Sequence, residues 1–108
     1  MFVNTERELA LSSNVSFEVK IMSLTGVSIV TTTWNESENI GKLIFITRNV
    51  LQGLQHEIIV VDDKSTDGTF QIANRLADLA VTKIREGQNK GLLHGMQLAK
   101  YPIIISAR

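Results

Sequence analysis

The sequence predicts an α/β fold in which helices cover both faces of a mainly parallel sheet. Apolar runs of strand length alternate with amphipathic stretches of helical length, in the order β-α-β-α-β-α-β. The first run, residues 27–32, is β-branched throughout except at Ser28, as expected for a strand buried on both faces. Strands that alternate with helices imply right-handed crossovers, so the pattern predicts a Rossmann-like three-layer sandwich.

The first helix is expected to follow the strand at 27–32 directly. Asn35 is a candidate cap, Glu36 and Glu38 would lie in the first turn, and Gly53 suits the end of the helix. One helical stripe carries the apolar residues Ile40, Leu43, Ile44, Leu51 and Leu54.

The remaining elements repeat this alternation. The pattern predicts a strand over 57–61, a turn-rich loop over 62–68, a helix over 69–80, a strand over 81–84, a polar loop over 86–91, a helix over 92–100 and a strand over 102–105. The second helix is expected to bury Phe70, Ile72, Ala73, Leu76 and Ala80.

Residues 1–24 are polar and weakly patterned, and they are expected to form an extension to the patterned domain at 25–108. A short edge strand is predicted over 17–21. Met22 stands just before the regular pattern, which suggests that the upstream residues are dispensable. The segment lacks the basic start and apolar centre of a secretory signal, so no export is expected.

Composition indicates one small globular domain, because 44% of the 108 residues are hydrophobic and 20% are charged. Eleven basic residues balance eleven acidic ones, which argues against general nucleic-acid binding. There is no cysteine, so disulfides and thiolate metal sites are excluded. No apolar run reaches the roughly 20 residues of a membrane span. We expect a cytoplasmic location, extending to the cytoplasmic membrane face through an acceptor or partner.

Acidic residues follow the second predicted strand directly. In parallel sheets ligands bind at the carboxyl ends of strands, where Asp62 and Asp63 lie. A carboxylate there can accept hydrogen bonds from a nucleobase ring nitrogen or from ribose hydroxyls. For either acid alone, an Asx-type role in the following loop is an equal alternative.

The neighbouring strand ends in Thr33-Trp34-Asn35-Glu36. The Trp34 ring could lie against a nucleobase, whereas taken alone it is better explained as packing over the sheet edge. Asn35 and Glu36 taken alone are explained by helix capping. The combination of this motif with the acidic pair is more specific than either motif.

The segments VSIVTTTWNESENI (27–40) and EIIVVDDKSTDGT (57–69) together resemble a family-2 glycosyltransferase with the GT-A fold. The likeness is to the N-terminal half of dolichol-phosphate mannose synthase-like enzymes, and it implies a truncated GT-A nucleotide-diphospho-sugar transferase fold. The residues that it assigns to nucleotide-sugar binding are Thr32, Trp34, Glu36 and Asp63, with Asp62 as a weaker member. Thr32 replaces a proline, Trp34 a tyrosine and Lys64 a glycine or acid, which leaves the choice between GDP and UDP open.

The resemblance extends to Arg85, Lys90-Gly91-Leu92 and Gly95. Arg85 and Lys90 could contact a phosphate from the loop that precedes the last helix. A simple turn between strand and helix is an equal alternative, because the loop has neither a dinucleotide fingerprint nor a P-loop.

The resemblance also implies a divalent cation, Mg or Mn, held by a D-x-D motif after the fourth strand. Here the chain reads Ile105-Ser106-Ala107-Arg108, so the Asp ligands are absent from it. His56 and His94 show no metal-ligand spacing, and no residue is assigned as catalytic base.

The resemblance therefore implies a domain that binds a nucleotide-sugar for transfer to a lipid-phosphate or saccharide acceptor, and that is incomplete as an isolated catalyst. One alternative is a non-catalytic nucleotide-binding or interaction module, which would associate with itself or a partner through an exposed sheet edge. A receiver-like signalling domain is disfavoured, because no aspartate follows Asp78 at a later strand end.

Overall fold

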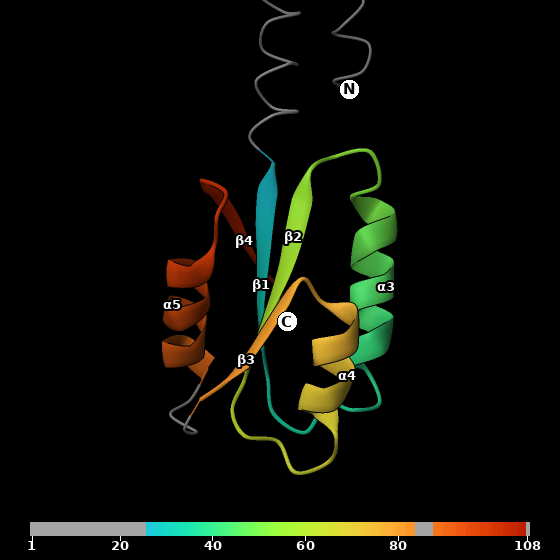
Figure 1. Ribbon diagram of the computed structural model, residues 1–108, viewed down its shortest axis with the longest axis vertical. Coiled ribbons are helices and arrows are strands. Elements are labelled where there is room, and N and C mark those ends of the chain that lie inside the picture. The colour runs from blue at the N-terminus through green and yellow to red at the C-terminus, as the bar shows by residue number, and fades with distance from the viewer. Residues whose placement is uncertain (1–25, 84–87, 108) are drawn as a thin grey trace, which may run out of the picture.

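The structure is a computed structural model that describes residues 26–83 and 88–107 (Figure 1). Its elements are β1 (Val27–Thr33), α3 (Ile40–Val50), β2 (His56–Asp62), α4 (Thr69–Leu76), β3 (Leu79–Thr82), α5 (Gln88–Leu98) and β4 (Ile103–Ala107). The predicted alternation of strands and helices is confirmed over this range. The edge strand predicted over 17–21 and the upstream residues predicted to be dispensable lie outside the described residues.

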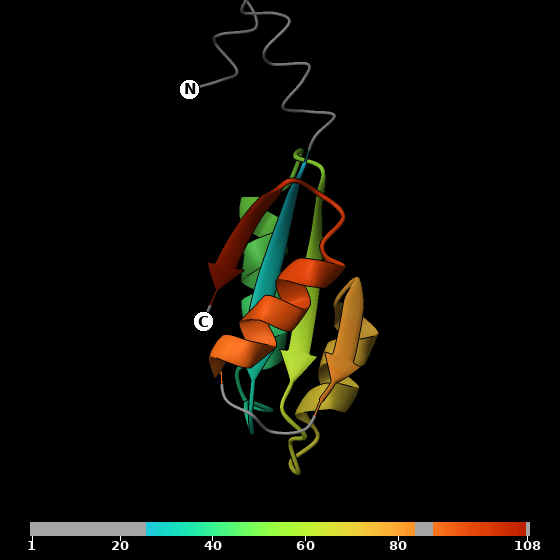
Figure 2. The ribbon, with the colours of Figure 1, turned by 90° about the vertical axis from the view of Figure 1, so that its left-hand side faces the viewer.

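The strands form one parallel sheet in the order β3-β2-β1-β4. Helices α3 and α4 cover one face, and α5 covers the other, as the two views in Figures 1 and 2 show. The three-layer sandwich is therefore confirmed, and it is consistent with part of a GT-A fold. The chain runs outward from β1 through β2 to β3, and then crosses back to place β4 on the other side of β1.

Alternation along the two central strands divides the core between the faces. One cluster, under α3 and α4, consists of Val27, Ile29, Ile40, Ile44, Ile58, Val60 and Ala73. The other, under α5, consists of Val30, Ile59 and Val61, with Leu92 and Ile104 packed against them. Both faces of β1 and β2 are thus buried, which explains their nearly continuous β-branched sequence.

Two glycines let α5 lie directly on the sheet. A Cβ atom added at Gly95 would meet Val30 Cγ1 at 2.3 Å, and one added at Gly91 would meet Thr32 Cγ2 at 3.0 Å. These residues lie one helical turn apart on the same side of α5. The helix is therefore packed closely over β1 and β2 as far as Thr32.

Several element boundaries differ from the prediction. Helix α4 ends at Leu76 rather than at residue 80, because Ala77 is already extended and Asp78 N–H donates to Ile58 O at 3.0 Å. Ala80 consequently lies in β3, and Leu76, expected to be buried, is 43% exposed. Helix α5 begins at Gln88 rather than at residue 92.

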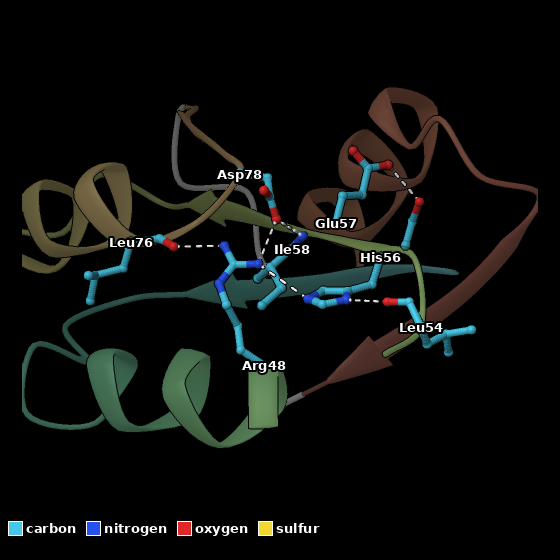
Figure 3. A network of polar contacts seen from close by, with 8 residues as sticks. Arg48, Leu54, His56, Glu57, Ile58, Leu76 and Asp78 are labelled. Atoms are coloured by element: carbon cyan, nitrogen blue, oxygen red, sulfur yellow. Dashed lines mark hydrogen bonds and ion pairs between the residues drawn. The ribbon is translucent and has the colours of Figure 1, made fainter. Parts of the chain in front are cut away.

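An arginine-centred network joins α3, α4 and the start of β2 (Figure 3). Arg48 donates to Leu76 O at 2.9 Å and to Asp78 Oδ2 at 3.1 Å. His56 Nδ1 lies 2.8 Å from Leu54 O, and its Nε2 lies 3.3 Å from Arg48 Nη1. Because a carbonyl only accepts, Nδ1 carries the proton and Nε2 accepts from Arg48. His56 thus has a structural role.

A buried glutamate fixes the connection into β4 on the α5 face. Glu57, 7% exposed, accepts from the Ser28 hydroxyl at 2.6 Å and from Lys100 N–H at 2.7 Å through the same oxygen. Tyr101 N–H in turn donates to Ser28 Oγ at 3.2 Å. These bonds lie at the amino ends of the strands, away from the predicted ligand edge.

No helix in the described part of the chain is long and apolar enough to cross a membrane.

Candidate functional site

The carboxyl ends of β1 and β2 lie side by side. Thr33 pairs with Asp62 in the parallel register, and Asp63 N–H donates to Thr33 O at 2.9 Å. The fold therefore brings the two sequence motifs to one edge of the sheet. Trp34 and Glu36 are on the segment that leaves β1, and Asp63 is on the segment that leaves β2.

The two adjacent acids have different surroundings. Asp62 is completely buried and accepts from the Thr33 hydroxyl at 2.6 Å, the Ser65 hydroxyl at 2.6 Å and the Ser65 N–H at 2.8 Å. Both of its carboxylate oxygens are thus committed to protein donors. Of the two roles that the sequence left open for Asp62, the geometry favours the structural one.

Asp63 is 6% exposed, and its Oδ1 has no hydrogen-bond partner in the part of the chain that the structure describes. Leaving a buried carboxylate oxygen without a donor costs free energy of about 1–3 kcal/mol or more. Alternation along the strands places Asp63 and Thr32 toward the α5 face, where Gly91 packs on Thr32. Asp63 thus has an acceptor oxygen without a donor among the described residues at the carboxyl edge of the sheet, where ligands bind in folds of this class.

Trp34 and Glu36 are exposed on the segment that leaves β1, and 45% of Trp34 is accessible. The prediction that Asn35 caps the first helix is wrong. Helix α3 begins at Ile40 with Asn39 as its N-cap, so Glu36 and Glu38 precede the helix. Asn35 has a left-handed backbone, with φ of 54°, a conformation that asparagine tolerates better than most residues.

Side chains of the second loop hold the backbone of the first. The N–H groups of Asn35, Glu36 and Ser37 donate to Ser65 Oγ at 2.8 Å, Thr69 Oγ1 at 2.8 Å and Asp67 Oδ2 at 3.1 Å, respectively. In the other direction, Thr66 N–H donates to Asn35 Oδ1 at 3.0 Å. No role was predicted for Ser65, Asp67 or Thr69. Their run of small polar side chains is a turn signal, and it does not reveal a partner loop some 30 residues away.

Asp67 has the strongest electrostatic signature of this loop. The hydroxyl of Thr69, followed by further donors from Ser37 and Thr69, lowers the pKa of Asp67 to about 2. Desolvation acts in the opposite direction and does not offset these donors. The Asp67 carboxylate is therefore the form that links the two loops.

The predicted phosphate and metal contacts are only partly among the described residues. Arg85 lies outside the described residues, whereas Lys90 is exposed in the first turn of α5. The described residues include no group of three or more His, Cys, Asp or Glu side chains that could hold a metal ion. Ser106 and Ala107, at the end of β4, provide no carboxylate. The donor set present in these ranges does not fit a divalent cation.

The parallel sheet, with a buried and partly unsatisfied aspartate at its carboxyl edge, defines a Rossmann-like α/β protein whose candidate ligand edge is formed by β1 and β2. The chain belongs to glycosyl transferase family 2, whose family model matches residues 28–106. Membership confirms the resemblance inferred from the two motifs and sets aside the receiver-like alternative.

Among curated proteins, the dolichol-phosphate mannosyltransferase of Pyrococcus furiosus is 45% identical to the chain over 67 residues. The aligned region is 61% of this chain and 19% of that protein. The chain thus spans about a fifth of the length of this relative.

Proposed function

We propose that this chain binds a nucleotide-diphospho-sugar, a GDP- or UDP-sugar, for glycosyl transfer to a lipid-phosphate or saccharide acceptor. Family membership supports glycosyl transfer as the reaction class. The relative's description as a dolichol-phosphate mannosyltransferase supports a lipid-phosphate acceptor. The observation that carries the proposal is the buried Asp63 carboxylate with an unpartnered oxygen at the ligand edge.

In this proposal Asp63 recognises the nucleoside. Its free Oδ1 accepts a hydrogen bond from a base ring N–H or a ribose hydroxyl, which supplies the donor that the protein leaves out. A hydrogen bond to a charged group contributes about 1.5–3 kcal/mol, so the loss of this one contact weakens binding measurably. Trp34 offers a ring face for stacking on the base, and Thr32 and Glu36 border the same edge.

Family-2 glycosyltransferases generally use a divalent cation, which neutralises the diphosphate when it is bound. The described residues supply no fitting ligand set, so we assign them no metal-dependent step. Their part in the reaction is to bind and orient the nucleoside end of the donor. The catalytic base and acceptor contacts are not assigned to any of them.

Calorimetric titration tests this proposal. GDP, UDP, GDP-mannose and UDP-glucose are titrated with and without magnesium or manganese into the wild type, Asp63→Asn and the control Glu38→Gln. We expect one nucleotide to bind without metal, Asp63→Asn to weaken its binding about tenfold or more, and Glu38→Gln to leave it unchanged. If none of the four binds the wild type, the proposal is wrong.

A second candidate, an interaction module without catalysis of its own, is favoured by the free edge of the sheet. Strand β4 pairs only with β1 among the described strands, and Ile103 and Ile105 on it are 45% and 47% exposed. Apolar edge strands pair readily with other chains. This candidate predicts concentration-dependent association in sedimentation experiments, reduced in Ile105→Lys. A monomer at all concentrations contradicts it.

A further inference from the structure

The backbone N–H groups of the segment that carries Trp34 are bonded to the loop after β2. Three consecutive backbone N–H groups, those of residues 35–37, donate to side chains at 65, 69 and 67. Helix α3 starts at Ile40, whose N–H donates to Glu36 O at 2.9 Å, so the helix start holds one carbonyl of this segment, whereas the N–H groups of residues 35–37 are held by the second loop. We call the side chains of Asn35, Ser65, Asp67 and Thr69 the loop latch.

The latch is anchored in the core at one end. Ser65 Oγ accepts from Asn35 N–H and donates to the buried Asp62, which also accepts from Thr33. Ser65 therefore links the Asn35 backbone to the Asp62 carboxylate, which is completely buried. Because Trp34 lies between Thr33 and Asn35, both of its backbone neighbours are fixed to the same carboxylate, directly or through Ser65.

The latch also occupies the donors that a strand-to-helix loop ordinarily offers to an anion. The N–H groups of residues 35–37 would otherwise be available to phosphate oxygens. Since each is already bonded to an oxygen of the second loop, these N–H groups are not available to a ligand, and the segment presents side chains in their place. Trp34 and Glu36 are those exposed side chains.

We propose that Asn35 and Asp67 are positioning residues for nucleoside recognition: they hold the 33–37 segment so that the Trp34 ring faces the base while Asp63 accepts its polar edge. This inference rests on the proposed function. It goes further in assigning the orientation of the aromatic contact to two residues that do not themselves contact the ligand.

Two substitutions each remove a hydrogen bond between the two loops. Asn35→Gly removes the acceptor of Thr66 N–H and still permits the left-handed backbone. Asp67→Asn can keep an oxygen toward Thr69 N–H and replaces the oxygen that accepts from Ser37 N–H with a donor. Asn35→Asp keeps an acceptor oxygen and tolerates the same backbone, so it serves as the rescue variant.

Thr66→Ala is the matched control. It lies in the same exposed loop and retains the backbone N–H that donates to Asn35 Oδ1 at 3.0 Å, and it removes only the longer contact of the Thr66 hydroxyl with the same oxygen, at 3.5 Å. Any effect specific to the latch should therefore be absent from it.

The experiment combines two measurements on each variant, at a temperature where all are fully folded. Acrylamide quenching reports the environment of Trp34 directly, because the chain has a single tryptophan. Calorimetry with GDP and UDP reports affinity. We expect Asn35→Gly and Asp67→Asn to change Trp34 quenching and to weaken the bound nucleotide about tenfold, with Asn35→Asp and Thr66→Ala close to wild type.

The outcomes separate the two claims. Unchanged Trp34 quenching and unchanged affinity in both latch variants would overturn the positioning role, even if the wild type binds nucleotide. Altered quenching with unchanged affinity would overturn it too, because the loop would then move without consequence for the ligand. Absence of binding by the wild type contradicts the proposed function, and quenching then still decides whether the latch holds the Trp34 segment.

Discussion

Replacing Gly95 with alanine tests the close packing of α5 on the central strands of the sheet. The new methyl carbon would lie 2.3 Å from Val30 Cγ1 and 3.1 Å from Val61 Cγ2. Carbon atoms in ordinary contact are about 3.5–4.0 Å apart, so the helix or the strands must shift by about 1 Å. Val30 and Val61 are completely buried, which leaves little room to move.

Two opposing effects set the change in unfolding free energy caused by Gly95→Ala. Overpacking a core costs about 1–3 kcal/mol, while alanine gains about 1 kcal/mol over glycine in a helix. Because the overlap at Gly95 is severe, we expect a net loss of about 1–2 kcal/mol, which lowers Tm by about 5 °C or more in a domain of this size. The assay is chemical and thermal unfolding followed by circular dichroism.

Gly41→Ala is the matched control in α3. There the added carbon would lie 3.7 Å from Leu76 Cδ1, an ordinary contact, so only the helix-propensity gain remains. We expect Gly41→Ala to stabilise the protein by about 0.5–1 kcal/mol. If Gly95→Ala were as stable as Gly41→Ala, the close approach of α5 to the sheet would be refuted.

Three further predictions concern the acids. Asp62→Asn should destabilise the fold by about 1–3 kcal/mol, because an amide nitrogen replaces one of two buried acceptor oxygens; denaturant unfolding measures this, and a loss within error would contradict it. The pKa of Asp67 in the folded protein is about 2, below its usual 3.8, so its contribution to stability is complete above pH 3.8 and is lost as the pH falls toward 2. Asp67→Asn should therefore make the free energy of unfolding less dependent on pH in this acidic range. An unchanged dependence would contradict this prediction. Asp78→Ala should lower the free energy of unfolding by more than the loss of its ion pair with Arg48 explains. The exposed ion pair contributes at most about 1 kcal/mol, and the substitution also removes the acceptor of Ile58 N–H at 2.7 Å. A double-mutant cycle with Arg48→Ala separates the two contributions.

The fold could be predicted from the sequence largely because burial on both faces leaves a clear pattern. The β-branched runs that became β1 and β2 were placed within one or two residues of their observed ends. The boundaries that were missed depend on tertiary contacts. Ala77 to Ala80 reads as helix by composition, but Asp78 bonds the β2 backbone in both directions and draws the chain into β3.

The site was predictable as an edge and less so in its internal roles. Strand-end logic brought Trp34, Glu36 and the two acids together, yet adjacent aspartates look alike in sequence. Only the structure shows that the hydroxyls of Thr33 and Ser65 donate to Asp62, whereas one oxygen of Asp63 has no donor in the part of the chain that is described. Asn35 was misread as a helix cap for a related reason, because capping and loop bridging favour the same residue type.

The central claim is that Asp63 recognises a nucleoside at the carboxyl edge of β2, and one comparison tests it most directly. The affinity of the wild type for its preferred nucleotide is measured by calorimetry beside that of Asp63→Asn, with unfolding free energies determined for both. The account predicts that Asp63→Asn loses about tenfold or more in affinity while remaining at least as stable as the wild type, because its Oδ1 position has no protein donor to lose. Equal affinity, or a stability loss that accounts for the weaker binding, would contradict it.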